Sequence, residues 1–318
     1  MPANRAFLHS IDYAAGCAVP VAGLIDHGIA VETVDELLHK GVQAFARLAR
    51  PLDQVIADCV QGALDKSGLR GDAIDSVILV TESFAELFDD GRTALSFRQI
   101  RNRCYDLFYG LGITRAVLLC ATYGGCTNFL QASLLASSLV QQGLARQVLL
   151  VAAERFATLE SRLMDEAVSI AGDGVAACVV SAAPPAGTAF RLDFIGMSPY
   201  KNIVPGADMA ARLLEMFRSM KHAAADCYDA CRMQPGDFRW VVLGDYNRST
   251  TLTYSRLLGF PPQRAFLENV GQLGHIPFDP LINLADLQHA QLVGDTDAVL
   301  LFLCGPLSCG AVAVTTCQ

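Results

Sequence analysis

The segment that decides the fold is LLCATYGGCTNF, residues 118–129. Its aliphatic start predicts a strand over 116–120, and the spacing of apolar residues over 127–142 predicts a helix directly after the Gly-Gly turn. Cys126 then lies at the helix N-terminus, where unpaired N–H groups and the helix dipole favour a thiolate. A thiolate on such a turn is the nucleophile that acyl-enzyme chemistry needs. The alternative is a buried structural thiol, because the chain has eleven cysteines.

A helix followed by a buried strand occurs twice in the chain. The helical spacing over 53–67 precedes an apolar run at 76–81, and the spacing over 216–231 precedes another run at 239–244. A weaker correspondence relates the strand, helix and strand of residues 116–152 to strands expected at 298–303 and 310–315. The chain therefore contains an internal repeat of α/β units.

This repeat predicts an α/β fold of two pseudo-repeated halves that share one core. Alternating helices and strands form mostly parallel sheets that are covered on both faces. We place the N-terminal half, with the nucleophile cysteine, at 1–183 and the C-terminal half, with a histidine and a glycine loop, at 184–318. The seam between them is AAPPAG, residues 182–187, since no longer Pro/Ser/Gly linker separates independent domains.

Composition and charge exclude several classes of protein. The 318 residues are 52% hydrophobic, and a chain of this length buries roughly three quarters of its unfolded surface. With 32 acidic against 24 basic residues, the net charge of -8 argues against nucleic-acid and anionic-membrane partners. No secretory signal pattern opens the chain, and the apolar stretch 146–153 is far shorter than the roughly 20 residues that cross a bilayer. We expect a cytoplasmic protein without a membrane span.

The cysteines and glycines outside the nucleophile turn predict no metal or phosphate site. Most cysteines are expected to be buried, reduced thiols. The close pairs at 227/231 and 304/309 lack the C-x-x-C spacing and a second Cys/His pair, so we expect no structural metal. Residues 172–174, Gly-Asp-Gly, lack the spacing of a phosphate-binding loop and are interpreted as a turn that closes the core.

The turn around Cys126 resembles the nucleophile segment of thiolase-fold condensing enzymes, in particular the β-ketoacyl-ACP synthase III-like branch. Four further segments agree with that family in order and spacing, at 144–154, 171–177, 238–242 and 305–310. The resemblance implies a thiolase-like five-layered αβαβα fold, usually a homodimer, with a tunnel for a pantetheine thioester. The expected substrate and partner is therefore acyl-coenzyme A or an acyl-carrier protein carrying phosphopantetheine, with no permanently bound cofactor.

The family's site consists of a Cys, a His and an Asn, and the sequence departs from it at two positions. Gly244 stands where the family has its His, and His275 stands where it has its Asn. In the family these side chains donate hydrogen bonds to the enolate formed by decarboxylation, and losing one such donor costs about 3 kcal/mol. Decarboxylative condensation is therefore doubtful, whereas His275 alone serves as the general base in acyl transfer. A structural histidine, or one in a subunit without activity, is the alternative.

Further residues complete the expected site. Asp245 is expected to orient the imidazole as the third member of a triad, the alternative being a solvated loop acid. Asp279 ranks below it, because Asp before Pro is common in turns. The resemblance implies that the backbone N–H groups of Gly305 and Cys126 bind the thioester oxyanion. The residues expected to contact substrate are Asn247 and Phe129.

Two functions fit these features. The first is a ketoacyl-synthase-III-like acyltransferase that loads an acyl group on Cys126 and transfers it to an acceptor in specialised metabolite or lipid biosynthesis. The second is a catalytically silent partner subunit of a heteromeric condensing enzyme. The changes at residues 244 and 275 favour the second function, while the retained Cys126 and Gly305 favour the first.

Overall fold

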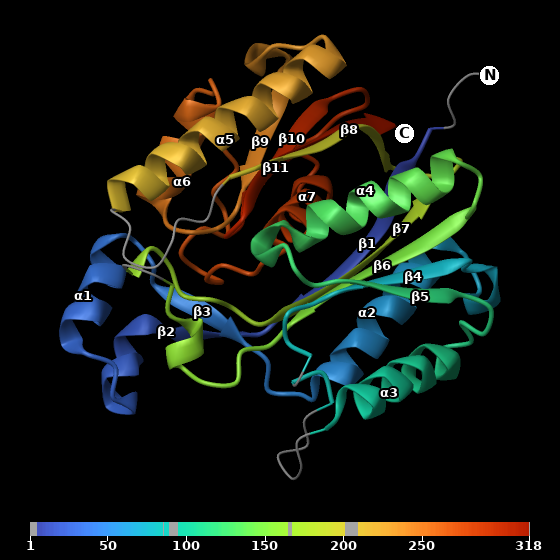
Figure 1. Ribbon diagram of the computed structural model, residues 1–318, viewed down its shortest axis with the longest axis horizontal. Coiled ribbons are helices and arrows are strands. Elements are labelled where there is room, and N and C mark those ends of the chain that lie inside the picture. The colour runs from blue at the N-terminus through green and yellow to red at the C-terminus, as the bar shows by residue number, and fades with distance from the viewer. Residues whose placement is uncertain (1–4, 85, 89–94, 165–166, 201–208, 318) are drawn as a thin grey trace.

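Five strands from the first part of the chain lie side by side in the computed structural model, which describes residues 5–84, 86–88, 95–164, 167–200 and 209–317 (Figure 1). Their order is β5 (Val117–Ala121), β4 (Ser76–Val80), β6 (Gln147–Glu154), β7 (Gly174–Ser181) and β1 (Phe7–Ala15). β4 runs parallel to β5 and β6, whereas β7 is antiparallel to β6 and β1.

Four strands from the second part repeat this order, namely β9 (Phe238–Leu243), β10 (Ala298–Cys304), β11 (Ser308–Cys317) and β8 (Ala189–Pro199). β9 is parallel to β10, and β11 is antiparallel to β10 and β8. The counterpart of β5 is reduced to one parallel bridge between Val241 and Ala265. Pro261 and Pro262 precede that bridge and have no N–H to donate to a ladder. β1 pairs with β8, which joins the two sets of strands into one sheet.

The sheet is mixed, and the prediction of mostly parallel sheets was wrong. β10 and β11 are separated only by residues 305–307, which is too short for the crossover that parallel strands require. Among the described residues between β6 and β7 there is no α-helix, and that pair also runs antiparallel. The strands β4, β5, β6, β9, β10 and β11 begin and end within about two residues of the predicted apolar runs, whereas β1, β2 (Cys17–Pro20), β3 (Ala44–Arg47), β7 and β8 were not predicted.

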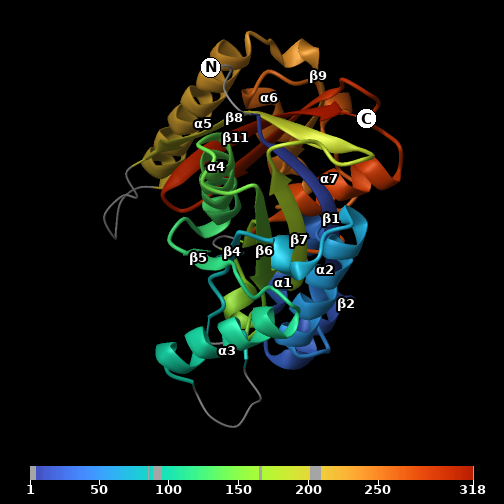
Figure 2. The ribbon, with the colours of Figure 1, turned by 90° about the vertical axis from the view of Figure 1, so that its right-hand side faces the viewer.

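The helices form three layers around the strands, as Figures 1 and 2 show. One outer layer consists of α2 (Leu52–Ser67) and α3 (Phe97–Gly110), and the other of α5 (Met209–Cys231) and α6 (Arg248–Leu257). Between the two sets of strands lie α4 (Asn128–Gln141), which contacts β4, β6 and β8, and α7 (Asp279–His289), which contacts β9, β10 and β1. This is the expected five-layered αβαβα arrangement. A small unit beside it consists of α1 (Val31–His39), β2 and β3.

Continuous apolar runs form these strands because both faces of the sheet are covered. Along β4, Ile78 and Val80 point into the core around α4 and α7. Val77 and Leu79 point to the opposite face, into the core beneath α2 and α3. The period-two alternation of a strand thus feeds two cores from one run of five residues.

The structure also bears on disulfides, membrane spans and metal sites. All eleven cysteines are free, and six of them are buried. Across the described ranges, no helix combines the length and apolar character needed to cross a bilayer. Within the same ranges, no cluster of three or more His, Cys, Asp or Glu side chains is arranged to hold a metal ion.

The Gly-Asp-Gly turn at 172–174 ties several segments together through one buried carboxylate. Asp173 Oδ2 accepts from the Leu48 N–H at 3.0 Å, and Oδ1 accepts from the Phe156 N–H at 3.0 Å. Arg162 Nη1 lies 2.7 Å from Asp173 Oδ1, and both side chains are at most 3% exposed. The expected core-closing role of this turn therefore has a physical basis in a buried ion pair.

Asp173→Ala should lower the free energy of unfolding by about 3–5 kcal/mol, because it leaves the Arg162 guanidinium buried without its counter-charge. The measurement is urea unfolding at pH 7, followed by circular dichroism. Asp106→Ala, which removes an exposed carboxylate on α3, is the matched control and should change that free energy by less than about 0.5 kcal/mol. Equal losses in the two variants would contradict the assigned role of the ion pair.

Candidate active site

Cys126 lies on a glycine turn between β5 and α4. Gly125 has φ of +59°, in the left-handed region that favours glycine. The Gly124 N–H donates to Asn128 Oδ1 at 2.7 Å, and Thr127 Oγ1 donates to the Gly124 carbonyl at 2.8 Å. These contacts hold Cys126 in a 3₁₀ turn, one residue before the Thr127 N-cap of α4. The cysteine therefore sits beside the helix N-terminus, as predicted.

His275 is held through its backbone by the neighbouring glycine turn. Its N–H donates to the Ile170 carbonyl at 2.8 Å, and its carbonyl accepts from the Gly172 N–H at 3.0 Å. A Cβ at Gly172 would lie 2.2 Å from the Leu273 carbonyl oxygen. A Cβ at Gly274, where φ is +70°, would lie 2.4 Å from the Ile170 oxygen. Both glycines are needed because the two backbones approach closely where they position His275.

Cys126, His275 and Asp279 form one hydrogen-bonded chain. His275 Nε2 lies 3.1 Å from Cys126 Sγ, and His275 Nδ1 lies 2.6 Å from Asp279 Oδ2. Asp279 is itself fixed, because Oδ1 accepts from the Ile276 N–H at 2.6 Å and Oδ2 accepts from the Asp245 N–H at 2.7 Å. It is also the first residue of α7, where the helix dipole favours a negative charge.

The surroundings of His275 favour the charged form of its imidazole. His275 is 2% exposed and Asp279 is 1% exposed, whereas Cys126 is half-buried. Burial lowers the pKa of His275, but the charges and hydrogen bonds of Cys126 and Asp279 outweigh it and hold that pKa well above its ordinary value. A protonated imidazole hydrogen-bonded to the Asp279 carboxylate is therefore favoured at this position.

Asp245 does not orient the imidazole, contrary to the prediction. Its Oδ1 accepts from Asn283 Nδ2 at 3.0 Å, and no bond joins its carboxyl to His275 in the part of the chain that the structure describes. Burial, followed by the nearby charge of Asp279, raises the pKa of Asp245 well above its ordinary value and favours the neutral acid. Asp279 takes the orienting position. The signal in the sequence was the turn chemistry of Asp279: its N–H donates to the Ile276 carbonyl and its carboxylate accepts from the Ile276 N–H, and this turn brings the carboxylate beside His275.

Three other predicted residues are engaged in the structure around the site. Asn247 caps α6, because its Oδ1 accepts from the Thr250 N–H at 2.9 Å and its amide N–H groups are also paired. Phe129 is 1% exposed and packs in the core around α4. The Gly305 N–H donates to the Ser308 carbonyl at 2.8 Å within its own loop. The substrate contacts expected of Asn247 and Phe129 therefore find no support in their bonding, and the Gly305 amide is not free.

A carboxylate beside the nucleophile turn escaped the sequence analysis. Glu82 Oε1 accepts from Asn128 Nδ2 at 3.3 Å. Partial burial raises the pKa of Glu82. The Glu82 N–H in turn donates to Glu154 Oε1 at 2.8 Å, and burial raises the pKa of Glu154 to about 8. The ends of the parallel strands β4 and β6 bring the two acids together, so no local pattern in the sequence reveals them.

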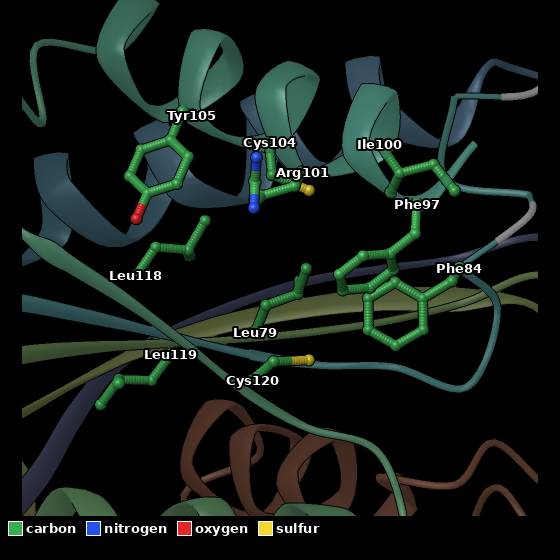
Figure 3. Close-up of a pocket in the computed structure, with 10 residues that line it drawn as sticks. All are labelled: Leu79, Phe84, Phe97, Ile100, Arg101, Cys104, Tyr105, Leu118, Leu119 and Cys120. Atoms are coloured by element: carbon green, nitrogen blue, oxygen red, sulfur yellow. The ribbon is translucent and has the colours of Figure 1, made fainter. Parts of the chain in front are cut away.

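The hollow in Figure 3 is separate from this site. It lies between α3 and the strands β4 and β5, at the edge of the sheet, with a volume of about 200 Å³. Cys104 on α3 and Cys120 on β5 lie on opposite sides of it. Burial raises the pKa of Cys104 to about 12 and that of Cys120 to about 11, which disfavours a reactive thiolate at either position. The hollow lies at the edge of the sheet, and its lining does not include Cys126, His275 or Asp279.

Comparison with known proteins points to one family. The family model of 3-oxoacyl-[acyl-carrier-protein] synthase III matches residues 122–195, which include Cys126. The β-ketoacyl-[acyl-carrier-protein] synthase III of Cereibacter sphaeroides is 30% identical over 166 residues, which are 50% of this chain and 46% of that protein. The chain thus matches about half the length of this curated relative.

Solved structures extend the likeness to almost the whole chain. ChlB3, described as an acyltransferase, has a TM-score of 0.79 at 21% identity, and the superposition covers 98% of this chain and 97% of ChlB3. The 3-oxoacyl-[acyl-carrier-protein] synthase III of Aquifex aeolicus has a TM-score of 0.77 at 16% identity, covering 98% of this chain and 99% of that one. At these identities, the structures establish the fold alone. The structures thus show that the chain has the thiolase-like fold of these synthases, and the sequence around Cys126 is similar to the synthase III family.

Proposed function

We propose that the protein is an acyltransferase that takes an acyl group from a thioester onto Cys126 and passes it to an acceptor. The observation that carries this proposal is the hydrogen-bonded chain from Cys126 Sγ through His275 to Asp279. Acyl-coenzyme A or an acyl-carrier protein is the proposed donor, in keeping with the relatives named as acyl-carrier-protein synthases. This chemistry needs no permanently bound cofactor, since the protein supplies both the nucleophile and the base.

In the first half-reaction, Cys126 becomes acylated. The thiolate attacks the carbonyl carbon of the thioester, and the tetrahedral intermediate collapses with loss of the donor's sulfur, which takes the proton held by His275. The backbone N–H of Cys126 is the first oxyanion donor in this scheme. Gly305 is the second, and its N–H must then be shared between the Ser308 carbonyl and the oxyanion.

In the second half-reaction, the acyl group leaves the enzyme. His275 Nε2 accepts the proton of an incoming hydroxyl, amine or preformed carbon nucleophile, which attacks the acyl carbon and releases Cys126. Asp279 keeps Nδ1 protonated, so that Nε2 faces the reacting atoms throughout. The acceptor belongs, in this proposal, to specialised metabolite or lipid biosynthesis.

Decarboxylative condensation fits the site less well than acyl transfer. Position 244 carries no side chain, so one of the two donors that would stabilise an enolate is missing. The remaining imidazole is bound on both nitrogens, by Cys126 and Asp279. A catalytically silent partner subunit remains the second candidate, yet a subunit without chemistry has no need of a buried, charge-coupled Cys-His-Asp chain.

The proposed assembly is a homodimer formed through the free edge of β5. In the described part of the chain, β5 pairs with β4 on one side only. Apolar side chains gather there, with Phe97, Val117 and Tyr123 at 69%, 58% and 89% exposure. An unpaired apolar edge strand is a template for pairing with a second copy.

Incubation with a panel of acyl-coenzyme A esters should add the mass of one acyl group to the protein, on Cys126. Intact-protein mass spectrometry with peptide mapping measures this. Cys126→Ala should abolish the mass gain, because the acyl group then has no thiol to occupy. Cys120→Ala removes a second thiol, six residues away, whose raised pKa disfavours the reactive thiolate, and it should retain the gain. If Cys126→Ala still gained the acyl mass, or if no ester gave a mass gain in the wild-type protein, acyl loading on Cys126 would be refuted.

Asp279→Asn should slow acyl loading by roughly 10²–10⁴-fold, because an amide cannot hold the imidazole in the tautomer and charge state that serves Cys126. The matched control is Asp245→Asn. Since the neutral acid is already favoured at that position, this variant should load within about threefold of the wild-type rate. Rates come from quenched-flow mass spectrometry, and thermal melts confirm folding. A larger effect at Asp245 than at Asp279 would reverse the assignment.

Val117→Arg should convert the dimer to a monomer, because it places a charge on the edge strand that pairs with the second copy. Light scattering coupled to size-exclusion chromatography at micromolar concentration measures the mass. Val31→Arg, at an exposed position on α1, should leave the dimer intact. A wild-type monomer, or a Val117→Arg dimer, would show that this edge is not the interface.

A further inference from the structure

Tyr246 occupies the space that the absent side chain at position 244 leaves open. A Cβ built on Gly244 would lie 3.0 Å from both Cε2 and Cζ of the Tyr246 ring. The Tyr246 N–H donates to the Gly244 carbonyl at 2.9 Å, which folds the ring back over that glycine. A side chain at 244 would therefore push the ring aside, and the two compete for the same space.

The Tyr246 ring packs against the imidazole of His275. The two ring centroids are 4.6 Å apart and the planes are tilted by 34°, so the rings face one another. The tyrosine is 5% exposed, and its hydroxyl donates to the Cys304 carbonyl at 2.8 Å. Tyr254 supports it edge-on, at a centroid distance of 5.8 Å. Tyr246 is thus fixed at its hydroxyl, at its backbone and at one edge, and its open face meets His275.

This contact completes the restraint on His275. Its two ring nitrogens are engaged by Cys126 and Asp279, and the hydrogen-bonding directions of ring nitrogens lie in the plane of an imidazole. In-plane bonds alone restrain tilting of the ring poorly, whereas a packed aromatic face opposes it. An aromatic face within about 6 Å also attracts a cation, which the imidazolium is.

We propose that Tyr246 is a positioning residue whose ring face holds the His275 imidazolium in the orientation that reaches Cys126 Sγ. The inference deepens the proposed function and rests on it only for the pairing of Cys126 with His275. The titratable groups that face His275 are Cys126 from the turn before α4, Asp279 from α7, and Asp245 and Tyr246 from the segment between β9 and α6. Among these, Tyr246 alone presents an aromatic face.

The test is the pH dependence of Cys126 alkylation by iodoacetamide, followed by mapping of the peptide that contains it. An imidazolium 3.1 Å from the sulfur favours the thiolate and sets a low midpoint, which rises when the ring turns away. His275→Ala gives the midpoint of Cys126 alkylation in the absence of the imidazole. Tyr246→Leu, which fills space but has no aromatic face, should raise the midpoint by about one pH unit toward that value.

Three further variants separate the ring face from other effects. Tyr246→Phe keeps the face and should retain the wild-type midpoint. Gly244→Ala displaces the ring without removing it and should shift the midpoint in the same direction as Tyr246→Leu, which keeps the test valid if the leucine variant fails to fold. Tyr228→Leu removes a tyrosine whose hydroxyl also donates to a backbone carbonyl, that of Leu258, and should leave the midpoint unchanged.

A wild-type midpoint in both Tyr246→Leu and Gly244→Ala would overturn the proposal, as would an equal shift in Tyr246→Phe, which would assign the effect to the hydroxyl. Alkylation requires no acyl donor. A low wild-type midpoint without acyl loading would therefore refute the proposed function and leave the role of Tyr246 standing. Normal loading with unmoved midpoints in both Tyr246→Leu and Gly244→Ala would do the reverse.

Discussion

The contact between Cys126 Sγ and His275 Nε2 is the constraint on which the site depends. It joins residues 149 positions apart, one from each half of the chain. Cys126 precedes α4 and His275 precedes α7, and these two helices occupy equivalent places between the two sets of strands. The internal repeat therefore brings two helix N-termini together. One lies beside Cys126, and the other supports the carboxylate that holds the imidazole.

Backbone proximity maintains this contact. The bridge between residues 171 and 275 ties the histidine to the Gly-Asp-Gly turn, whose Asp173 is in turn paired with Arg162. A side chain larger than hydrogen at Gly172 would meet the Leu273 carbonyl. The Gly-Asp-Gly turn, which the sequence predicted to close the core, thus also supports His275, the proposed base. The same residues serve the stability of the fold and the position of the imidazole.

The sequence differs from the ketosynthase pattern at residues 244 and 275. Position 244 carries no side chain, and the Tyr246 ring lies against that glycine. His275 packs on the face of this ring and is hydrogen-bonded to Asp279. The site therefore has one firmly held imidazole and no side-chain donor from residue 244, which is why we propose acyl transfer and not stabilisation of an enolate.

The α/β class, the internal repeat and the place of Cys126 beside a helix N-terminus could be predicted from the sequence, because apolar periodicity and the turn before a helix are local properties. His275 was singled out by the resemblance to the family. The mixed sheet and the hydrogen bond between His275 and Asp279, in place of one to Asp245, depend on how distant segments pack. Only the tertiary structure decided that Glu82 lies beside the nucleophile turn, and that Asn247 and the Gly305 amide are already paired. The physical reason is that hydrogen-bond partners, burial and the pKa values that follow from them depend on which distant segments meet, and a linear pattern does not contain that information.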